Sequence, residues 1–174
     1  MKKLAMAAAV GVVMAPSLAQ ANDWTGGYVG AQLGYGDVST SPSVGSGSGG
    51  IGGLVIGGDY DYGNWVLGAG LDYDWASISL GNGLKLKDVF RAKARLGYDL
   101  GTTLLYGSLG YARANVDPLG RDDGYFGGVG AEWWDGVNPW AVGGELLYHE
   151  FKDFKGTGVK AKATTLEVRV MYRF

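Results

Sequence analysis

Residues 164–174, TTLEVRVMYRF, decide which fold we expect for this chain. Alternate residues of a β-strand point to opposite faces of its sheet. One alternate set is Thr164, Leu166, Val168, Val170, Tyr172 and Phe174, and the other is Thr165, Glu167, Arg169, Met171 and Arg173. The first face is apolar and ends in two aromatic rings, whereas the second carries three charges. This pattern is typical of a closed barrel whose apolar face meets lipid and whose charged face lines the interior.

The first 21 residues have the three parts of a secretory signal peptide. These parts are a positive start at Lys2 and Lys3, an apolar run at 4–14, and the small-x-small cleavage site Ala19-Gln20-Ala21. The apolar run of about 12 residues is too short for a transmembrane helix, which needs about 20. We therefore expect a signal peptide at 1–21 and an outer-membrane β-barrel domain at 22–174.

Composition narrows the class of protein further. Without residues 1–21 the chain has 153 residues, enough for one domain, and its formal charge falls from −2 to −4 because Lys2 and Lys3 leave. That acidic balance gives no reason to expect a nucleic-acid partner. The chain has no cysteine, so its exported form must fold without disulfides. Many of its 33 glycines lie inside periodic segments, where they leave room for large neighbours.

Eight segments alternate with the period of a β-strand. They are residues 24–36, 51–62, 65–76, 88–100, 104–114, 125–134, 140–151 and 164–174. The connections after the second, fourth and sixth segments are short, and the other four, which include 37–50 and 115–124, are longer. Short periplasmic turns and longer outer loops characterise outer-membrane barrels, so we expect both termini in the periplasm.

Aromatic residues gather at the outward ends of these segments. They are Tyr60, Tyr62, Trp65, Tyr73, Trp75, Tyr98, Tyr111, Trp133, Trp140, Tyr148, Tyr172 and Phe174. Two interfacial girdles would require this arrangement. The alternative is a soluble eight-stranded barrel with apolar residues inside and charges outside. The charges instead share one strand face and the loops, which favours the membrane barrel.

Two longer stretches resemble a known family. They are residues 90–116 (FRAKARLGYDLGTTLLYGSLGYARANV) and 127–151 (GGVGAEWWDGVNPWAVGGELLYHEF), and the terminal VRVMYRF adds to them. All three resemble the small outer-membrane β-barrel family, which includes the OmpA membrane domain and alpha-proteobacterial surface antigens of the porin-family type. The resemblance implies an all-β, eight-stranded antiparallel up-and-down transmembrane barrel in the outer membrane of a Gram-negative bacterium.

The same resemblance implies partners and a charge network. Phe174 matches the terminal aromatic residue read by the barrel-assembly machinery, so that machinery, periplasmic chaperones, outer-membrane lipid and lipopolysaccharide are the expected partners of a monomer. A lumenal network is implied near Arg95 and Glu132. OmpA also has an arginine on its seventh strand that pairs with a glutamate. Gly143 takes that position here, so OmpA-like gating by partner exchange is not carried over.

The inward faces predict a balanced set of lumenal charges. They are Arg91, Lys93, Arg95, Arg169 and Arg173 against Asp72, Asp74, Glu132, Glu145 and Glu167. Buried charges are costly unless paired, and eight strands leave an interior that side chains can fill. The charges therefore predict a salt-bridged plug, with a charged lining of a water-filled pore as the alternative.

Strand order predicts which of these charges meet. We expect Asp72 and Asp74 beside Arg91 and Lys93, Arg169 and Glu167 near Glu145, and Arg95 reaching Glu132 across the lumen. Asp59, Asp61 and Asp99 should lie near the periplasmic end, where water can solvate them.

Other chemistry has weaker support. His149 is the only histidine, and no serine stands two residues after it as in outer-membrane deacylases, so a polar rim residue is expected. Asp122-Asp123-Gly124 lacks calcium-loop spacing and suggests a turn. The cations Lys152, Lys155, Lys160 and Lys162 suit either a solvated loop or contact with lipopolysaccharide phosphates.

These observations predict a non-catalytic barrel without a cofactor or metal, with a structural or surface-exposed role in the cell envelope. A narrow passive channel for small solutes is the alternative, and an enzyme is a third possibility without a recognisable catalytic triad.

The signal peptide gives a direct prediction. Export should be followed by cleavage after Ala21, because the small side chains of Ala19 and Ala21 fit the recognition site. Mass spectrometry of the protein extracted from membranes should find Asn22 as its first residue. Recovery of a cytosolic protein that still carries Met1 would contradict this assignment.

Overall fold

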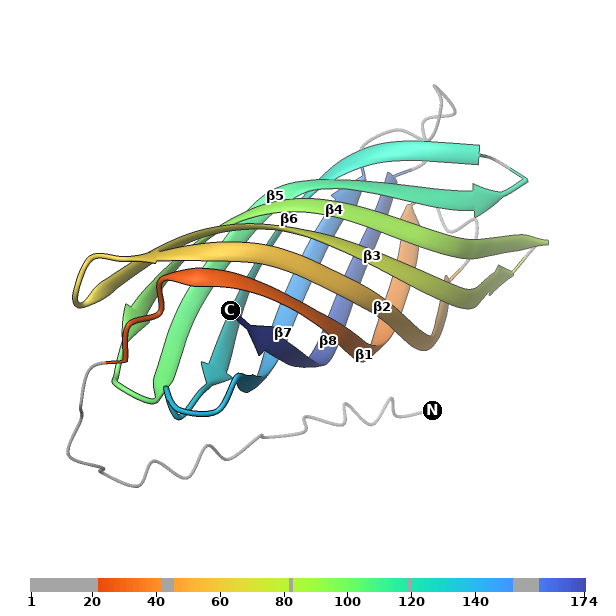
Figure 1. Ribbon diagram of the computed structural model, residues 1–174. Coiled ribbons are helices and arrows are strands. Elements are labelled where there is room, and N and C mark those ends of the chain that lie inside the picture. Colours follow the sequence, from red (N-terminus) through yellow and green to blue (C-terminus); the bar gives the residue numbers. More distant parts are fainter. Residues whose placement is uncertain (1–21, 42–45, 82, 119, 152–159) are drawn as a thin grey trace, which may run out of the picture.

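The alternating segments pair in chain order into one closed antiparallel barrel (Figure 1). The computed structural model describes residues 22–41, 46–81, 83–118, 120–151 and 160–174. Its strands are β1 (Gly26–Ser41), β2 (Ser46–Asp61), β3 (Trp65–Gly81), β4 (Leu84–Asp99), β5 (Thr103–Asp117), β6 (Gly120–Trp133), β7 (Trp140–Phe151) and β8 (Lys160–Arg173). The predicted fold class is confirmed. Among the described residues, no helix is long and apolar enough to cross a membrane.

The barrel closes where β1 meets β8. β1 pairs with β2 on one side and with β8 on the other, both antiparallel. At the end of this seam, Gly27 and Phe174 exchange two backbone hydrogen bonds of 3.0 Å. The start of β1 and the last residue of the chain therefore lie side by side at one end of the barrel.

The outer surface is apolar and the interior holds the charges. On β8, Leu166, Val168 and Val170 are exposed, whereas the intervening Glu167 and Arg169 are both 0 % exposed. A water-soluble protein has the reverse distribution, because exposed apolar area and buried charge both cost free energy in water. The predicted orientation of the two faces is thus found in the structure.

Two aromatic bands bound the apolar surface. Near the chain termini, Trp65 packs edge-on against Tyr98, and Trp140 packs in the same way against Tyr172. Farther along β3, Tyr73 packs against Trp75. Trp65 and Trp75 are ten positions apart in the sequence, and a tilted strand crosses the hydrocarbon layer in about 9–11 residues. The distance between the bands therefore matches a bilayer.

Three predicted outer loops are wrong in extent. The segments 77–87 and 115–124 are mostly paired strand, and β1 and β2 extend well into the predicted loop 37–50. The physical reason is an apolar cluster inside the end of the barrel away from the chain termini, which includes Ile78, Leu80, Leu86, Val116 and Phe126. Burying these side chains stabilises the strands beyond the membrane.

The same extension corrects the reading of Asp122-Asp123-Gly124. These residues lie within β6 and form no turn, and Asp123 accepts a hydrogen bond of 2.7 Å from Arg113 on β5. Lys152 and Lys155 lie outside the described residues.

Inward glycines make room for large rings. A Cβ added at Gly130 would lie 2.5 Å from both Cζ and Oη of Tyr106, and 2.8 Å from the carbonyl oxygen of Gly144. A Cβ at Gly107, on the lipid-facing side, would find its nearest heavy atom at 3.8 Å. The interior is thus filled to the point where a single methyl group does not fit.

Gly130→Ala should therefore destabilise the barrel by about 1–3 kcal/mol, because overpacking forces Tyr106 or the β7 backbone to move. Gly107→Ala is the matched control and should change stability by less than about 0.5 kcal/mol. Urea unfolding of the refolded proteins in lipid vesicles measures both. Equal stability of the two variants would show that the interior has free space at Gly130.

The charge network inside the barrel

Among the residues that the structure describes, six buried carboxylates and five buried cations form two ion-paired clusters in the lumen. They form a central cluster of Asp72, Asp74, Arg91, Lys93, Glu145, Glu167 and Arg169, and a lower cluster of Asp59, Arg95, Glu132 and Arg173, which lies toward the chain termini. Each comes from an inward position of its strand. None is more than 7 % exposed. The sequence prediction thus placed nine of its site residues, together with Arg173, on the face where the structure has them.

Arg91 on β4 is the hub of the central cluster. Its guanidinium donates two hydrogen bonds to Glu167 on β8, of 2.7 and 2.9 Å, and a further short one to Asp74 on β3. Its Nε lies 3.5 Å from Asp72. Asp74 also accepts a bond of 2.6 Å from Gln32 on β1. Because β4 and β8 lie opposite each other in a ring of eight strands, this group spans the lumen.

Lys93 and Arg169 complete the central cluster around Glu145 on β7. The Lys93 Nζ lies 3.0 Å from Asp72 and 3.2 Å from Glu145, and Arg169 makes a short contact with Glu145. Arg169 also lies 3.6 Å from Glu167. The expected contacts between these charges are present, and they join β3 and β4 to β7 and β8 across the lumen.

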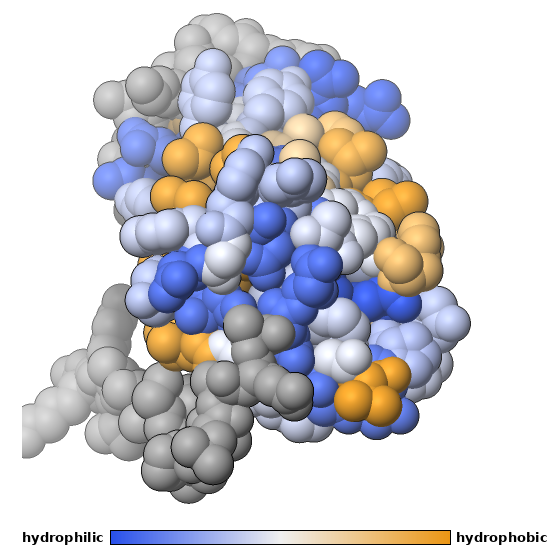
Figure 2. All heavy atoms as spheres, turned by 60° about the vertical axis from the view of Figure 1, so that its left-hand side comes forward, coloured by the Kyte–Doolittle hydropathy of each residue, from blue (hydrophilic) through white to orange (hydrophobic). Residues whose placement is uncertain are grey.

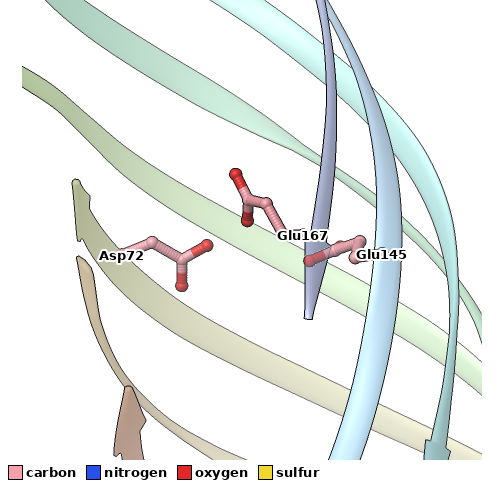
Figure 3. Close-up of side chains that lie close together, drawn as sticks. All are labelled: Asp72, Glu145 and Glu167. Atoms are coloured by element: carbon pink, nitrogen blue, oxygen red, sulfur yellow. The ribbon is translucent and has the colours of Figure 1, made fainter. Parts of the chain in front are cut away.

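Three carboxylates converge in this cluster (Figure 3). Asp72, Glu145 and Glu167 each offer an oxygen, and these atoms lie within 4.8 Å of one another. Such a group could in principle hold a metal ion. However, Lys93 already bridges Asp72 and Glu145, and both arginines of the cluster contact Glu167. The protein's own cations therefore occupy the place that a metal would take.

The lower cluster is a closed ring of four charges. Arg95 binds Glu132 at 2.8 Å and donates two hydrogen bonds to Asp59. Arg173 contacts the same two carboxylates, each at 3.0 Å. The prediction that water solvates Asp59 is wrong, because two arginines reach it and it is 7 % exposed.

Two tyrosine side chains hold Arg95 of the lower cluster in place. The guanidinium of Arg95 lies over the ring of Tyr28, 4.8 Å from its centroid, and over that of Tyr106 at 5.0 Å. A cation placed on two aromatic faces gains electrostatic stabilisation that is larger when water is excluded. We call Tyr28, Arg95 and Tyr106 the aromatic clamp.

Two further polar residues are more deeply buried than the sequence suggested. His149 is no rim residue: it is 3 % exposed, its Nε2 lies 3.5 Å from Arg91, and its ring packs between Phe126 and Phe151. Asp99 is also buried, and it accepts a hydrogen bond of 3.0 Å from the indole of Trp24. Phe126 and Trp24 lie far from His149 and Asp99 in the sequence, so periodicity does not reveal these contacts.

Comparison with known proteins agrees with this architecture. The family model for the outer membrane protein beta-barrel domain matches residues 5–174. Among solved structures, Neisserial surface protein A (NspA) is 19% identical with a TM-score of 0.61, and the match covers 86% of this chain and 98% of that one. Ail, the attachment invasion locus protein of Yersinia pestis, is 12% identical with a TM-score of 0.50, and covers 84% and 99%.

At these identities the two structures show a shared fold and nothing more. No curated protein sequence matches the chain. The family match, which covers nearly the whole sequence, carries the assignment together with the closed eight-stranded barrel: this chain belongs to the outer membrane protein β-barrel domain family.

Proposed function

We propose that this protein is a non-catalytic outer-membrane barrel with a closed lumen, which has a structural or surface-exposed role in the cell envelope. One observation carries the proposal: the central cluster crosses the lumen from β4 to β8, and the lower cluster joins β2, β4, β6 and β8 in a ring inside it. Glu167 on β8 binds Arg91 on β4, and Glu132 on β6 binds Arg173 on β8. An eight-stranded barrel is narrow enough for such a network to fill it.

The energetics favour a network that stays closed. A buried charge whose partner is removed typically costs about 3–5 kcal/mol, so a transient opening that separates Arg95 from its carboxylates is expensive. The aromatic clamp adds to that cost. Gly143 supplies no cation from β7. Arg169 from β8 approaches Gly143 instead, with the Arg169 Cγ 3.5 Å from where a Cβ of residue 143 would stand. These contacts support a lumen without an exchangeable gate.

A non-catalytic role is supported by the surroundings of His149. Its Nε2 faces the Arg91 guanidinium, and two phenylalanine rings cover the imidazole. A general base needs access to its substrate within hydrogen-bond reach. His149 lacks this access in the barrel as it stands.

A narrow passive channel is the second candidate, and unpaired polar atoms favour it. Asp72 Oδ1, Tyr106 Oη, and Nε and Nη1 of Arg169 have no hydrogen-bond partner among the described residues. Buried polar groups of this kind are commonly satisfied by water. A continuous file of such waters would make the lumen a conduction path.

We further propose that both termini are periplasmic and that the long hairpins face outward. The exposed cations Lys85, Lys87, Arg113 and Arg121 lie on the β4–β6 face beyond the aromatic band, at the level where phosphate groups of the outer leaflet would be. This position supports lipopolysaccharide as the lipid partner, with residues 1–21 removed as a signal peptide.

Planar-bilayer recording of the refolded protein tests the closed lumen. We expect no steady conductance from the wild-type barrel. Arg95→Ala/Glu132→Ala removes one charge of each sign and widens the lumen, so its conductance should exceed the wild-type baseline. Steady porin-like conductance of the wild-type protein would replace the structural role with the channel.

A double-mutant cycle provides the energetic control. Arg95→Ala and Glu132→Ala should each destabilise the barrel by about 3–5 kcal/mol, and the double variant should cost less than the two singles together. The exposed pair Lys87–Asp117, at 2.9 Å, is the matched comparison and should show a coupling of about 0–1 kcal/mol. A buried pair that couples no better than this surface pair would indicate a solvated lumen.

The last residue gives a prediction about assembly. Phe174 is 74 % exposed, so its side chain packs little in the finished barrel and remains available to the assembly machinery. Deletion of Phe174 should reduce the amount of protein inserted in the outer membrane severalfold, with little change in the unfolding midpoint of the molecules that do insert. Normal insertion of the deletion variant, measured by cell fractionation, would refute the role of Phe174 as an assembly signal.

A further inference from the structure

The four residues before β1 cross the end of the barrel at which the chain termini lie. Trp24 belongs to no strand, yet it is 0 % exposed. Figure 2 turns this end of the barrel forward and shows hydrophilic residues gathered in its centre, with apolar residues around them. An indole buried at a polar barrel mouth needs a specific binding pocket, and we call the residues that surround the Trp24 side chain its seat.

The seat of Trp24 reaches the far wall of the barrel. Its side chain belongs to a buried apolar cluster with Val66 on β3 and Leu104 and Tyr106 on β5, against which Trp134 after β6 packs. The rings of Trp24 and Trp134 meet edge-to-face, with centroids 5.6 Å apart. Since β5 lies opposite β1 in the ring of eight strands, the cluster that contains both Trp24 and Leu104 extends across the opening.

Hydrogen bonds fix this segment to several strand ends. The Trp24 indole N–H donates to Asp99 Oδ1 at 3.0 Å, and its backbone N–H donates to Asp61 Oδ2 at 3.0 Å. The side-chain amide of Asn22 donates to the carbonyl of Trp134 at 2.8 Å. Residues 22–25 are therefore attached to the ends of β2, β4 and β6.

The segment also touches the lower cluster. Arg173 donates a hydrogen bond of 2.6 Å to the carbonyl of Trp24, and its guanidinium lies 5.1 Å from the ring centroids of both Trp24 and Trp134. The same Arg173 binds Asp59 and Glu132. Seating of Trp24 thus covers the periplasmic side of the charge network.

We infer that residues 22–25 form a stopper that seals the periplasmic mouth, and that their seat is a binding site for an indole ring. The seat offers apolar walls at Val66 and Leu104, an aromatic edge at Trp134, and Asp99 as an acceptor for the ring N–H. In a variant that lacks the Trp24 side chain, the same seat accepts free indole.

The chain has no cysteine, so a single introduced thiol can report on the mouth. Val66→Cys places that thiol in the buried cluster that contains Trp24. In the refolded 22–174 protein, reaction with a small charged methanethiosulfonate reagent should be at least tenfold faster in Trp24→Gly than with Trp24 present. Trp133→Ala, which removes a lipid-facing indole at the same end, is the control and should leave the rate unchanged.

Free indole provides a second readout. Added to the Trp24→Gly variant, it should restore protection of the thiol in a saturable manner, and it should have no effect when Asp99 is also replaced by alanine. If Trp24→Gly does not refold, Trp24→Phe keeps the ring but loses the N–H donor and should give an intermediate rate. Migration of unheated samples on gels establishes which variants are folded.

Equal labelling rates with and without Trp24 would overturn the stopper. Bilayer recording then separates the two proposals: if wild-type protein conducts nothing, the reagent has entered through an unsealed mouth and the closed lumen stands. If wild-type protein conducts steadily, the reagent has come through the lumen, and the closed lumen fails as well. Failure of indole to protect the folded Trp24→Gly variant would overturn the binding site.

Discussion

Inside a bilayer, every backbone N–H and C=O must find its partner within the protein, and this constraint governs the rest of the structure. Eight strands satisfy it by closing on themselves, with β1 paired to β8. Closure fixes the width of the interior, which leaves room for side chains and little else. The charges that line it must then pair with one another, because few other partners are within reach.

The interior is filled in three layers of different chemistry. Apolar side chains such as Ile78 and Phe126 occupy the end away from the termini, the two charge clusters occupy the middle, and Trp24 with Trp134 occupies the end near the termini. Inward glycines such as Gly130 recur where large rings need space. Packing and pairing thus act together, since the aromatic clamp that fills space also holds Arg95 against its carboxylates.

Periodicity predicts the faces well and the contacts only in part. Alternation in β8 is enough to place Glu167 and Arg169 inside, because each strand residue must choose one of two sides. It does not say that Glu167 reaches Arg91 on the opposite strand, which depends on the barrel's width. Periodicity does not show that Asp59 is buried for the same reason, since the arginines that reach it come from β4 and β8. The sequence predicts a loop around Ile78 because the glycines and serines there resemble turn signals, while the apolar residues that pack with Ile78 lie on other strands.

The two charge clusters differ in their balance of carboxylates and cations. The lower cluster has two arginines and two carboxylates, so its formal charges balance, although the Tyr28 and Tyr106 hydroxyls beside it have no hydrogen-bond partner among the described residues. The central cluster has four carboxylates against three cations, and unpaired atoms on Asp72 and Arg169 leave it the better place for water. Water held there conducts only if it connects to both mouths. In the proposed closed state, the lower cluster, the aromatic clamp and the proposed stopper lie between this water and the mouth near the chain termini, so closure depends most on that end of the barrel.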